Sequence, residues 1–365
     1  EVVTRHVKDE AYLTAYFKNL KFALELVNRE SPDDTVGFVL EPDFLGYLAQ
    51  NEGRPAAEIP AATHTIYTSG LLKRGEDPAF PDSVKGFVSA VNYLIRKVSP
   101  QVYFGWQMNL WASPAGGWTV KILSRGVIRV TRDLGIEQGR GGIRREAQAL
   151  TRYYLVAGVA RHGAMCLLID KYGLDAVGFE PGAAANPAGS IWFWNADLWG
   201  NYLVFVRAMH DESTLPVILW QLPVGRINST LAKNPYAGSG KFPELANTHQ
   251  RYEDSAPTYF FGDTFRPGSE TRLRYFSTNE ARDPSINVNG EAVTWGQHMN
   301  AAARAGVVAA LFGAGVGMST SSVGSPPTED YWWITRAQEY FEKPVILSPD
   351  RSQRGSNSWN RRPSR

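Results

Sequence analysis

The most constraining feature of the chain is an apolar run that stops at two carboxylates and a proline. Residues 35–40 (TVGFVL) are largely apolar without alternation, which predicts a β-strand buried on both faces, as in a parallel sheet. The run ends at Glu41-Pro42-Asp43, and proline cannot continue a central strand. In α/β barrels, groups at the carboxyl ends of the strands form the active site. The alternative is that Asp43 caps a helix beginning at Phe44 and that a loop satisfies Glu41.

The same pattern recurs later in the chain. Residues 175–180 (DAVGFE) form a second run, which ends at Glu180 before a proline and a glycine. Residues 258–263 (TYFFGD) form a third, which ends at Asp263. Two further runs, residues 102–109 (VYFGWQMN) and 216–221 (PVILWQ), end at amide side chains. We therefore expect acidic and amide groups to meet at the carboxyl edge of one parallel sheet.

Segments of helical character separate these runs and set the fold class. They cover residues 8–28, 83–98, 143–171, 195–210, 294–305 and 330–341, and a sixth strand is predicted within residues 306–317. This alternation predicts parallel βα units. The expected fold is α/β, a TIM-barrel-like (β/α) barrel of seven or eight parallel strands with loop insertions, one of them a hairpin at residues 119–131. Six strands are predicted directly, so closure of the barrel is inferred.

Length and composition fit a single large domain. The chain has 365 residues, of which 43% are hydrophobic, enough to fill a large core. We expect one catalytic barrel domain at residues 1–348. Residues 349–365 carry five arginines among serine, asparagine, glutamine and proline, and are expected to be a disordered tail or linker. Because the sequence begins at Glu1 without a methionine or signal peptide, we expect a processed form or a fragment.

Charge and residue usage argue against several kinds of partner. A net charge of +2 is too small to indicate a nucleic-acid partner, and no apolar run approaches the roughly 18 residues of a membrane span. The six histidines show no metal-ligand spacing, and the single cysteine, Cys166, is expected to be a buried hydrophobe in a helix. Residues 313–317 (GAGVG) lack the lysine of a phosphate-binding loop and are interpreted as the end of a strand. No metal or cofactor is therefore expected.

Tryptophan is the second strong signal. Seven of the 11 tryptophans fall at predicted strand ends or in the loops that follow them. Aromatic planes can stack on the C–H faces of sugar rings, and amides between them can bind the hydroxyls. The alternative is that these rings fill the barrel mouth and the seams between helices. The substrate-binding candidates are Trp106, Gln107, Asn109, Trp111, Trp192, Trp194, Trp220 and Gln221.

Residues 12–51 resemble a stretch of the family 6 cellulases. In that family a tyrosine-led amphipathic helix precedes a strand that ends in Glu-Pro-Asp, as it does here at Glu41-Pro42-Asp43. The resemblance implies a distorted barrel, a secreted hydrolase of β-1,4-glucan and an inverting mechanism. The family's Arg-Asp-Cys and Asp-Ala-Gly-His motifs have no counterpart in this chain, where Trp106-Gln107-Met108-Asn109 takes the place of the second. We therefore carry over the class of polysaccharide hydrolase and not the catalytic residues.

These observations predict hydrolysis of β-1,4-linked glucan, a cellulose-type polysaccharide. The reaction needs two carboxyl groups, one protonated to assist the leaving oxygen and one ionised to activate water or attack the anomeric carbon. The catalytic candidates are Glu180 and Asp43 first, then Glu41 and Asp263. Glu180 is the predicted acid, because the aromatic residues 192–194 could provide an apolar wall that raises its pKa.

Two other functions fit parts of the pattern. A non-catalytic polysaccharide-binding barrel would use the same aromatic groove without a competent acid. A barrel lyase or isomerase acting on a small anionic substrate would use residues 313–317 as a phosphate cup. A polysaccharide substrate would imply secretion, with no nucleic-acid or membrane partner. A carbohydrate-binding module beyond the C-terminal tail would suit this organisation.

Overall fold

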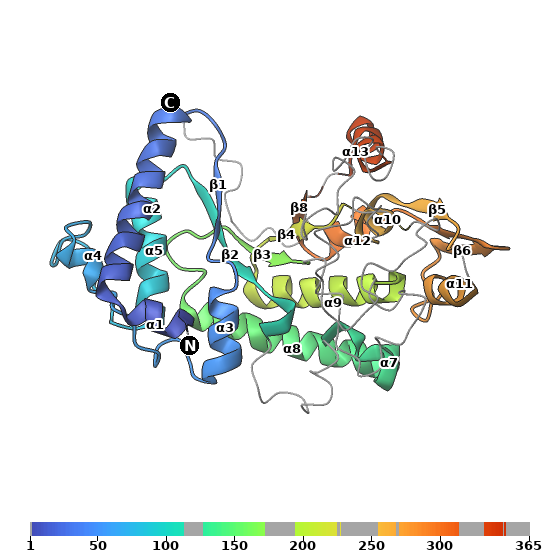
Figure 1. The fold of residues 1–365 in the computed structure, drawn as a ribbon, viewed down its shortest axis with the longest axis horizontal. Coiled ribbons are helices and arrows are strands. Elements are labelled where there is room, and N and C mark those ends of the chain that lie inside the picture. The colour runs from blue at the N-terminus through green and yellow to red at the C-terminus, as the bar shows by residue number, and fades with distance from the viewer. Residues whose placement is uncertain are drawn as a thin grey trace.

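Five parallel strands form the central sheet of the protein in a computed structural model (Figure 1). The structure describes residues 2–112, 127–171, 194–224, 227, 255–267, 270–313, 332–345 and 347. The strands, hydrogen-bonded in chain order, are β1 (Gly37–Leu40), β2 (Tyr103–Met108), β3 (Cys166–Asp170), β4 (Val217–Leu222) and β8 (Val307–Phe312). The α/β class with a parallel sheet is thus confirmed. Within the described residues β1 and β8 form the two edges, and the sheet does not close into a barrel.

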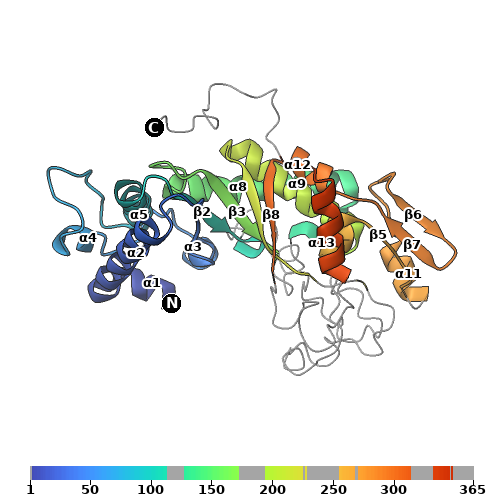
Figure 2. The same ribbon diagram turned by 90° about the horizontal axis from the view of Figure 1, so that it is seen from above.

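One layer of helices covers one face of this sheet. Each member precedes a strand in chain order, and neighbouring members pack side by side: α5 (Val84–Val98), α8 (Ile136–Ala157), α9 (Ala196–Ser213) and α12 (Met299–Arg304) (Figure 2). Right-handed crossovers between strands that follow chain order place all connecting helices on the same face. The wall of a barrel has this arrangement, whereas a doubly wound sheet carries helices on both faces.

Polar side chains mark where several of the predicted helices begin. Asp9 accepts a hydrogen bond from the backbone N–H of Tyr12 at 2.9 Å and starts α2 (Glu10–Glu30). Ser83 caps α5 in the same way at 3.2 Å, and Asn195 caps α9 at 3.1 Å. Such caps satisfy N–H groups that have no partner within the helix. The helices predicted at residues 8–28, 83–98 and 195–210 are confirmed.

The other described helices before α9 are short. They are α1 (Val2–Lys8), α3 (Phe44–Glu52), α4 (Thr65–Thr68), α7 (Thr131–Leu134) and two 3₁₀ turns, η1 (Leu110–Ala112) and η2 (Val127–Arg129). Because residues 127–134 are helical, the hairpin predicted at 119–131 is wrong over residues 127–131. Residues 119–126, the strand predicted at 175–180 and the tail at 349–365 lie outside the described residues.

A separate antiparallel sheet follows β4 in the chain. It contains β5 (Asp263–Phe265), β6 (Ile286–Asn289) and β7 (Ala292–Trp295) in the order β5-β7-β6. Two helices, α10 (Ala256–Phe261) and α11 (Glu270–Phe276), precede its strands, and α13 (Trp332–Glu342) packs against α10. The parallel strand predicted at residues 258–263 is therefore wrong. A short apolar run does not distinguish strand from helix, and Pro257 sits in the first turn of α10, where proline favours a helix.

Two predicted helices are interrupted. The segment 143–171 divides into α8, which ends at Ala157, and β3, which begins at Cys166. Gly158 stops α8 by adopting φ +101°, which favours glycine. Cys166 is buried, but in a strand, and its burial raises the pKa of the thiol to about 12. Residues 294–305 likewise divide between β7 and α12. Among the described helices, none is long and apolar enough to cross a membrane.

Candidate functional site

The side chains of the central sheet divide between the helix layer and the opposite face. The indole Nε1 of Trp106 donates to a buried asparagine of α5 at 2.8 Å, so this ring faces the helices. Because side chains alternate along a strand, Gln107 points to the opposite face. The register pairs Gln107 with Leu168, and pairs Asp170, two residues farther on, with Trp220. Gln107, Asp170 and Trp220 therefore share the face away from the helices, near the carboxyl ends of the strands.

Asn109 links two carboxylates that come from the strands on either side of its own. Its Nδ2 donates to Oδ1 of Asp43 at 2.6 Å and lies 3.5 Å from Oδ1 of Asp170. Since both oxygens contact one nitrogen, they can lie no farther apart than about 6 Å. Asp43 follows β1, Asn109 follows β2 and Asp170 ends β3, so three adjacent strands bring these groups together. Asn109 and Asp170 are buried.

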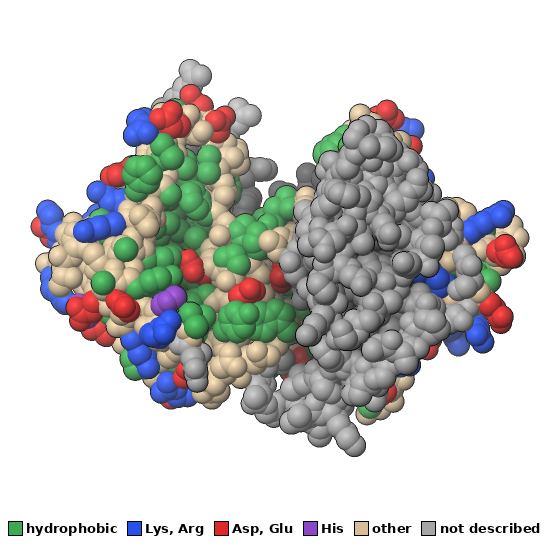
Figure 3. Space-filling view, in the orientation of Figure 1, with side chains coloured by type: hydrophobic (Ala, Val, Ile, Leu, Met, Phe, Trp, Pro, Cys, Tyr) green, Lys and Arg blue, Asp and Glu red, His purple; other side chains and the backbone are tan. Residues whose placement is uncertain are grey.

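Glu41 lies two residues before Asp43 and has a different environment. The hydroxyl of Tyr16, in α2, interacts with its carboxyl group. Burial raises the pKa of Glu41, and the interaction with Tyr16 opposes this only in part. In Figure 3, hydrophobic side chains gather over α2 and β1, with carboxylates among them. Glu41 therefore keeps its proton to a higher pH than an exposed glutamate, and can act as a proton donor.

The backbone around these residues is strained. Glu41 has φ +47°, Asp43 φ +68° and Gln221, in β4, φ +52°. They are three of the six non-glycine residues with positive φ in the described part of the chain. Such conformations cost free energy and concentrate at functional sites. The helix predicted to begin at Phe44 is confirmed, with Asp43 at its N-cap position, but the side chain of Asp43 makes no capping hydrogen bond.

Among the described residues, three buried polar atoms around the carboxylates have no hydrogen-bond partner. They are Oε1 of Gln107, Oδ1 of Asn109 and the hydroxyl of Tyr154, in α8. Burial raises the pKa of Tyr154 well above its usual value, and the nearby charges of Asp170 and Asp43 add to this shift. Buried polar groups in folded proteins are nearly always paired. The unpaired atoms therefore provide unused hydrogen-bonding capacity beside the carboxylates.

A pair of aromatic rings borders the cluster. The rings of Tyr47 and Trp111 lie 4.9 Å apart between centroids, and Tyr47 is 44% exposed. The backbone N–H of Tyr47 donates to the carbonyl of Asp43 at 2.9 Å, so the pair stands one helical turn from that carboxylate. Trp111 and Trp220 are half-buried. These rings offer partly exposed apolar planes on which a sugar could stack.

Two of the predicted sugar-stacking rings cannot serve in that way. Trp106 and Trp194 are fully buried. Trp106 faces the helix layer, as described above, and Trp194 packs beside Trp199, with the ammonium of Lys171 5.0 Å from its ring centroid. For these two tryptophans the alternative of packing in helix seams is correct, and the prediction of a binding role is wrong, because a sugar cannot reach them.

Other predicted residues lie elsewhere. Asp263 begins β5 in the antiparallel sheet and pairs with Arg336 at 3.3 Å, so its expected position at the end of a parallel strand is wrong. Glu180 and Trp192 lie outside the described residues, and their predicted roles stay predictions.

Sequence reasoning missed Asp170, Tyr154 and Tyr47. Asp170 had a usable signal, because residues 166–170 (CLLID) form an apolar run that ends at a carboxylate, as residues 35–41 do. The run was assigned to the preceding helix instead. Tyr154 and Tyr47 had none, because both lie in helices and reach the site only through packing.

No protein-family model, curated protein or solved structure matches the chain. Within the residues that the structure describes, no group of three or more histidine, cysteine, aspartate or glutamate side chains could hold a metal ion. The chemistry of the site must therefore be inferred from its own side chains.

Proposed function

We propose that the protein hydrolyses β-1,4-linked glucan with paired carboxyl groups as acid and base. The observation that carries this proposal is the set of three carboxyl groups, Glu41, Asp43 and Asp170, at the ends of two parallel strands that flank β2. Glycoside hydrolysis needs one carboxyl group that keeps its proton and one that is ionised. The raised pKa of Glu41 suits the first role, and the hydrogen bond that Asp43 accepts from Asn109 suits the second.

In this mechanism Glu41 donates its proton to the glycosidic oxygen while the bond to the anomeric carbon breaks. Asp43 either activates the attacking water or attacks the anomeric carbon itself. Asn109 orients Asp43 through their hydrogen bond at 2.6 Å, and because Asn109 and Gln107 are both buried, a sugar hydroxyl does not reach either amide. Proton donation of this kind accelerates such reactions by about 10²–10⁴-fold. Glu180 remains a candidate for the same acid role.

We also propose that the five-stranded sheet belongs to the wall of a (β/α) barrel of seven or eight strands. The strand order along the chain and the single helix layer support this. A glucan chain would then lie across the carboxyl ends of the strands, near Asp43 and Asp170, and stack on Tyr47 and Trp111. Because polysaccharides of this class lie outside the cell, we propose a secreted enzyme.

The test is release of reducing sugar from soluble cellulose and from mixed-linkage glucan. We expect activity in the wild type and a loss of at least about 100-fold in Glu41→Gln, because the amide cannot donate a proton. Glu41→Gln should still cleave an aryl cellobioside with a good leaving group, which needs no protonation. Glu58→Gln, a substitution of the same kind in an exposed loop, should behave as wild type.

Other outcomes would redirect or reject the proposal. If Glu41→Gln retains more than about a tenth of the rate and Glu180→Gln does not, Glu180 is the acid. If no glucan is cleaved but glucan still binds, the protein is a polysaccharide-binding module. If it neither cleaves nor binds glucan, the proposed substrate class is wrong.

A further inference from the structure

A cavity of about 680 Å³ lies among the helices, apart from the strand ends. Its walls come from α8, α9, α10, α12 and the residues just before α12, and from the loop at residues 281–285. None of the residues that line it belongs to the five strands of the central sheet. Small-molecule sites in proteins have volumes of roughly 300–1,000 Å³, so the cavity has the size of a binding site.

Positive charge is concentrated in this cavity. Five arginines and two aspartates line it, a net charge of +3 where the whole chain carries +2. Both aspartates are already engaged: Asp211 pairs with Arg207 at 2.8 Å, and Asp283 with His298 at 2.7 Å. The five arginines are Arg140, Arg144, Arg207, Arg282 and Arg304.

Three of these arginines have free guanidinium groups. Within the described residues, those of Arg144, Arg282 and Arg304 form no hydrogen bond or ion pair. Among the described residues, Arg140 donates only to the neutral amide of Asn201, at 3.0 Å. A planar guanidinium binds carboxylate and phosphate through two parallel hydrogen bonds. The cavity therefore has several unused anion-binding groups.

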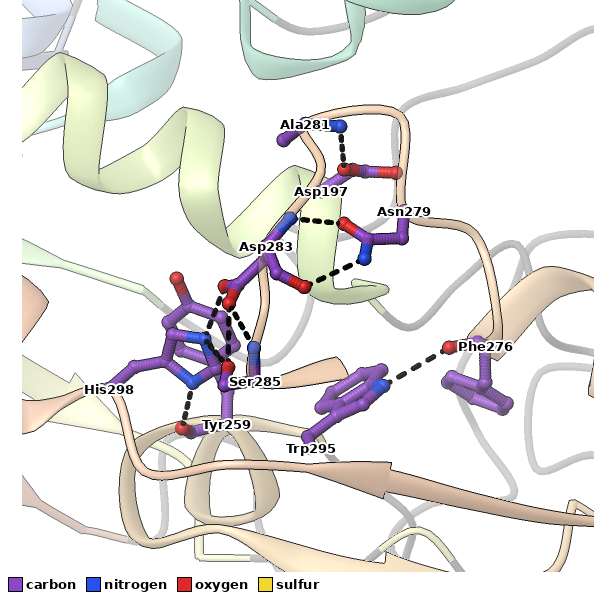
Figure 4. Close-up of polar contacts among 9 residues, drawn as sticks. All are labelled: Asp197, Tyr259, Phe276, Asn279, Ala281, Asp283, Ser285, Trp295 and His298. Atoms are coloured by element: carbon purple, nitrogen blue, oxygen red, sulfur yellow. Dashed lines mark hydrogen bonds and ion pairs between the residues drawn. The ribbon is translucent and has the colours of Figure 1, made fainter. Parts of the chain in front are cut away.

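The loop that forms one wall is held firmly in place (Figure 4). The carboxylate of Asp197, in α9, accepts hydrogen bonds from the backbone N–H groups of Glu280 and Ala281, both at 3.0 Å. The side chain of Asn279 bonds the backbone N–H and carbonyl of Asp283 at 2.6 and 2.8 Å. A wall fixed in this way needs little ordering when a ligand binds.

His298 anchors the floor of the cavity and is not part of a nucleophilic triad. Its Nδ1 lies 2.9 Å from the carbonyl oxygen of Tyr259, and its ring stacks on that tyrosine at 3.8 Å. Asp283 and Ser285 both contact the other nitrogen, Nε2. A triad needs the carboxylate and the hydroxyl on different ring nitrogens. The cluster of His298, Asp283 and Ser285 therefore has a structural role. It indicates that the cavity binds a ligand and does not hydrolyse one.

We propose that the cavity binds a small organic anion. Its phosphate or carboxylate groups bond the free guanidinium groups, and its apolar part lies against Leu203, Val204 and Ala301. This proposal is independent of glucan hydrolysis, since it uses none of the residues at the strand ends.

The test is titration of the full chain with 1-naphthyl phosphate and 1-naphthoate, with neutral 1-naphthol as the reference. We expect saturable binding of at least one anion that weakens as salt is added, and none of naphthol at the same concentration. Arg144→Gln and Arg304→Gln should each weaken binding about tenfold, because each removes a charged hydrogen-bond donor. Arg274→Gln makes the same charge change at an exposed arginine of α11 that does not line the cavity, and it should have no effect.

The preferred anion then identifies the headgroup as phosphate or carboxylate. Absence of binding by both anions would overturn the proposal, and so would equal weakening by Arg274→Gln. If a cavity variant does not fold, Arg304→Lys replaces it, which keeps the charge but loses the planar donor pair and should weaken binding less. Glucan hydrolysis should be unchanged in the cavity variants, so either proposal can fail without the other.

Discussion

Gly46 determines how closely α3 can lie to the carboxylate cluster. A β-carbon at this position would lie 2.5 Å from Oδ1 of Asn109 and 3.1 Å from the ring of Trp111. Contacts that short force a neighbour to move, and here the neighbour is the amide that holds Asp43. At the scale of single residues, the absence of one methyl group therefore supports the geometry of the candidate site.

Gly46→Ala should lower the free energy of unfolding by about 1–3 kcal/mol, as overpacking does in other proteins. The matched control is Gly141→Ala in α8, where a β-carbon would meet only the end of the Arg145 side chain, at 3.7 Å. That variant should gain about 0.5–1 kcal/mol, because alanine favours a helix more than glycine does. Urea denaturation followed by circular dichroism measures both. A similar stability for the two variants would show that α3 can shift at little cost.

The elements around the site begin in two different ways. Ser83 and Asn195 bond the first turns of α5 and α9, as helix caps usually do. Asp43 stands at the same position before α3 but directs its carboxylate to Asn109. Because the side chain of Asp43 bonds Asn109 and not the first turn of α3, the helix lacks the stability of a capping bond while the carboxylate is held in the site.

Because Ser83 caps a helix and Asp43 does not, we expect substitution of Ser83 to lower stability and substitution of Asp43 to lower activity instead. Ser83→Ala should cost about 1 kcal/mol of stability, since it removes a capping hydrogen bond. Asp43→Asn should change stability by no more than about 0.5 kcal/mol, because no cap is lost and asparagine tolerates positive φ. The proposed mechanism requires that Asp43→Asn nevertheless lose glucan hydrolysis. Thermal unfolding and the reducing-sugar assay, run on the same samples, separate the two effects. A large loss of stability in Asp43→Asn would mean that Asp43 is structural.

At the scale of the whole molecule, one polar cluster joins segments that are far apart in the chain. Asp283 precedes β6, His298 precedes α12 and Tyr259 lies in α10. Burial alone would raise the pKa of Asp283, but hydrogen bonds from Ser285 and His298 outweigh it and lower the pKa. The antiparallel sheet is thereby tied to the helix layer by an ionised carboxylate.

The sign of the pH dependence follows from this lowered pKa. Asp283 stabilises the fold at pH values above the ordinary aspartate pKa of about 3.9, and this contribution is lost as the pH falls through its folded-state pKa. Asp283→Asn should therefore be less stable than wild type at pH 7, and the difference should shrink below about pH 4. Melting temperatures at pH 7, 5 and 3 measure this. Asp34→Asn, in an exposed turn, is the control. A difference that does not change with pH would exclude the ionised pair as its cause.

Local patterns predicted four of the five central strands and the long helices beside them, but not the antiparallel sheet or most of the short helices. The helices predicted at residues 8–28, 83–98 and 195–210 begin within two residues of their predicted starts, because the caps Asp9, Ser83 and Asn195 act within their own turns. The strands at residues 37–40, 103–108, 217–222 and 307–312 were predicted because their apolar runs end at polar groups or glycine. β3 and α10 were assigned wrongly, because five or six apolar residues suit either a buried strand or a buried helix.

By itself, the sequence determined that this chain forms parallel βα units and that Glu41, Asp43 and Asn109 follow strands, since those signals lie within a few neighbouring residues. The expected burial of the first strand on both faces is wrong, because β1 lies at the edge of the described sheet and only Leu40 in it is buried. Only the tertiary structure decided which of these groups meet. Asn109 is 66 residues from Asp43 and 61 from Asp170 along the chain, and strand order and register place them together. The same packing turned Trp106 and Trp194 inward and placed Asp263 in another sheet. These outcomes depend on contacts summed over the whole molecule, which no local pattern contains.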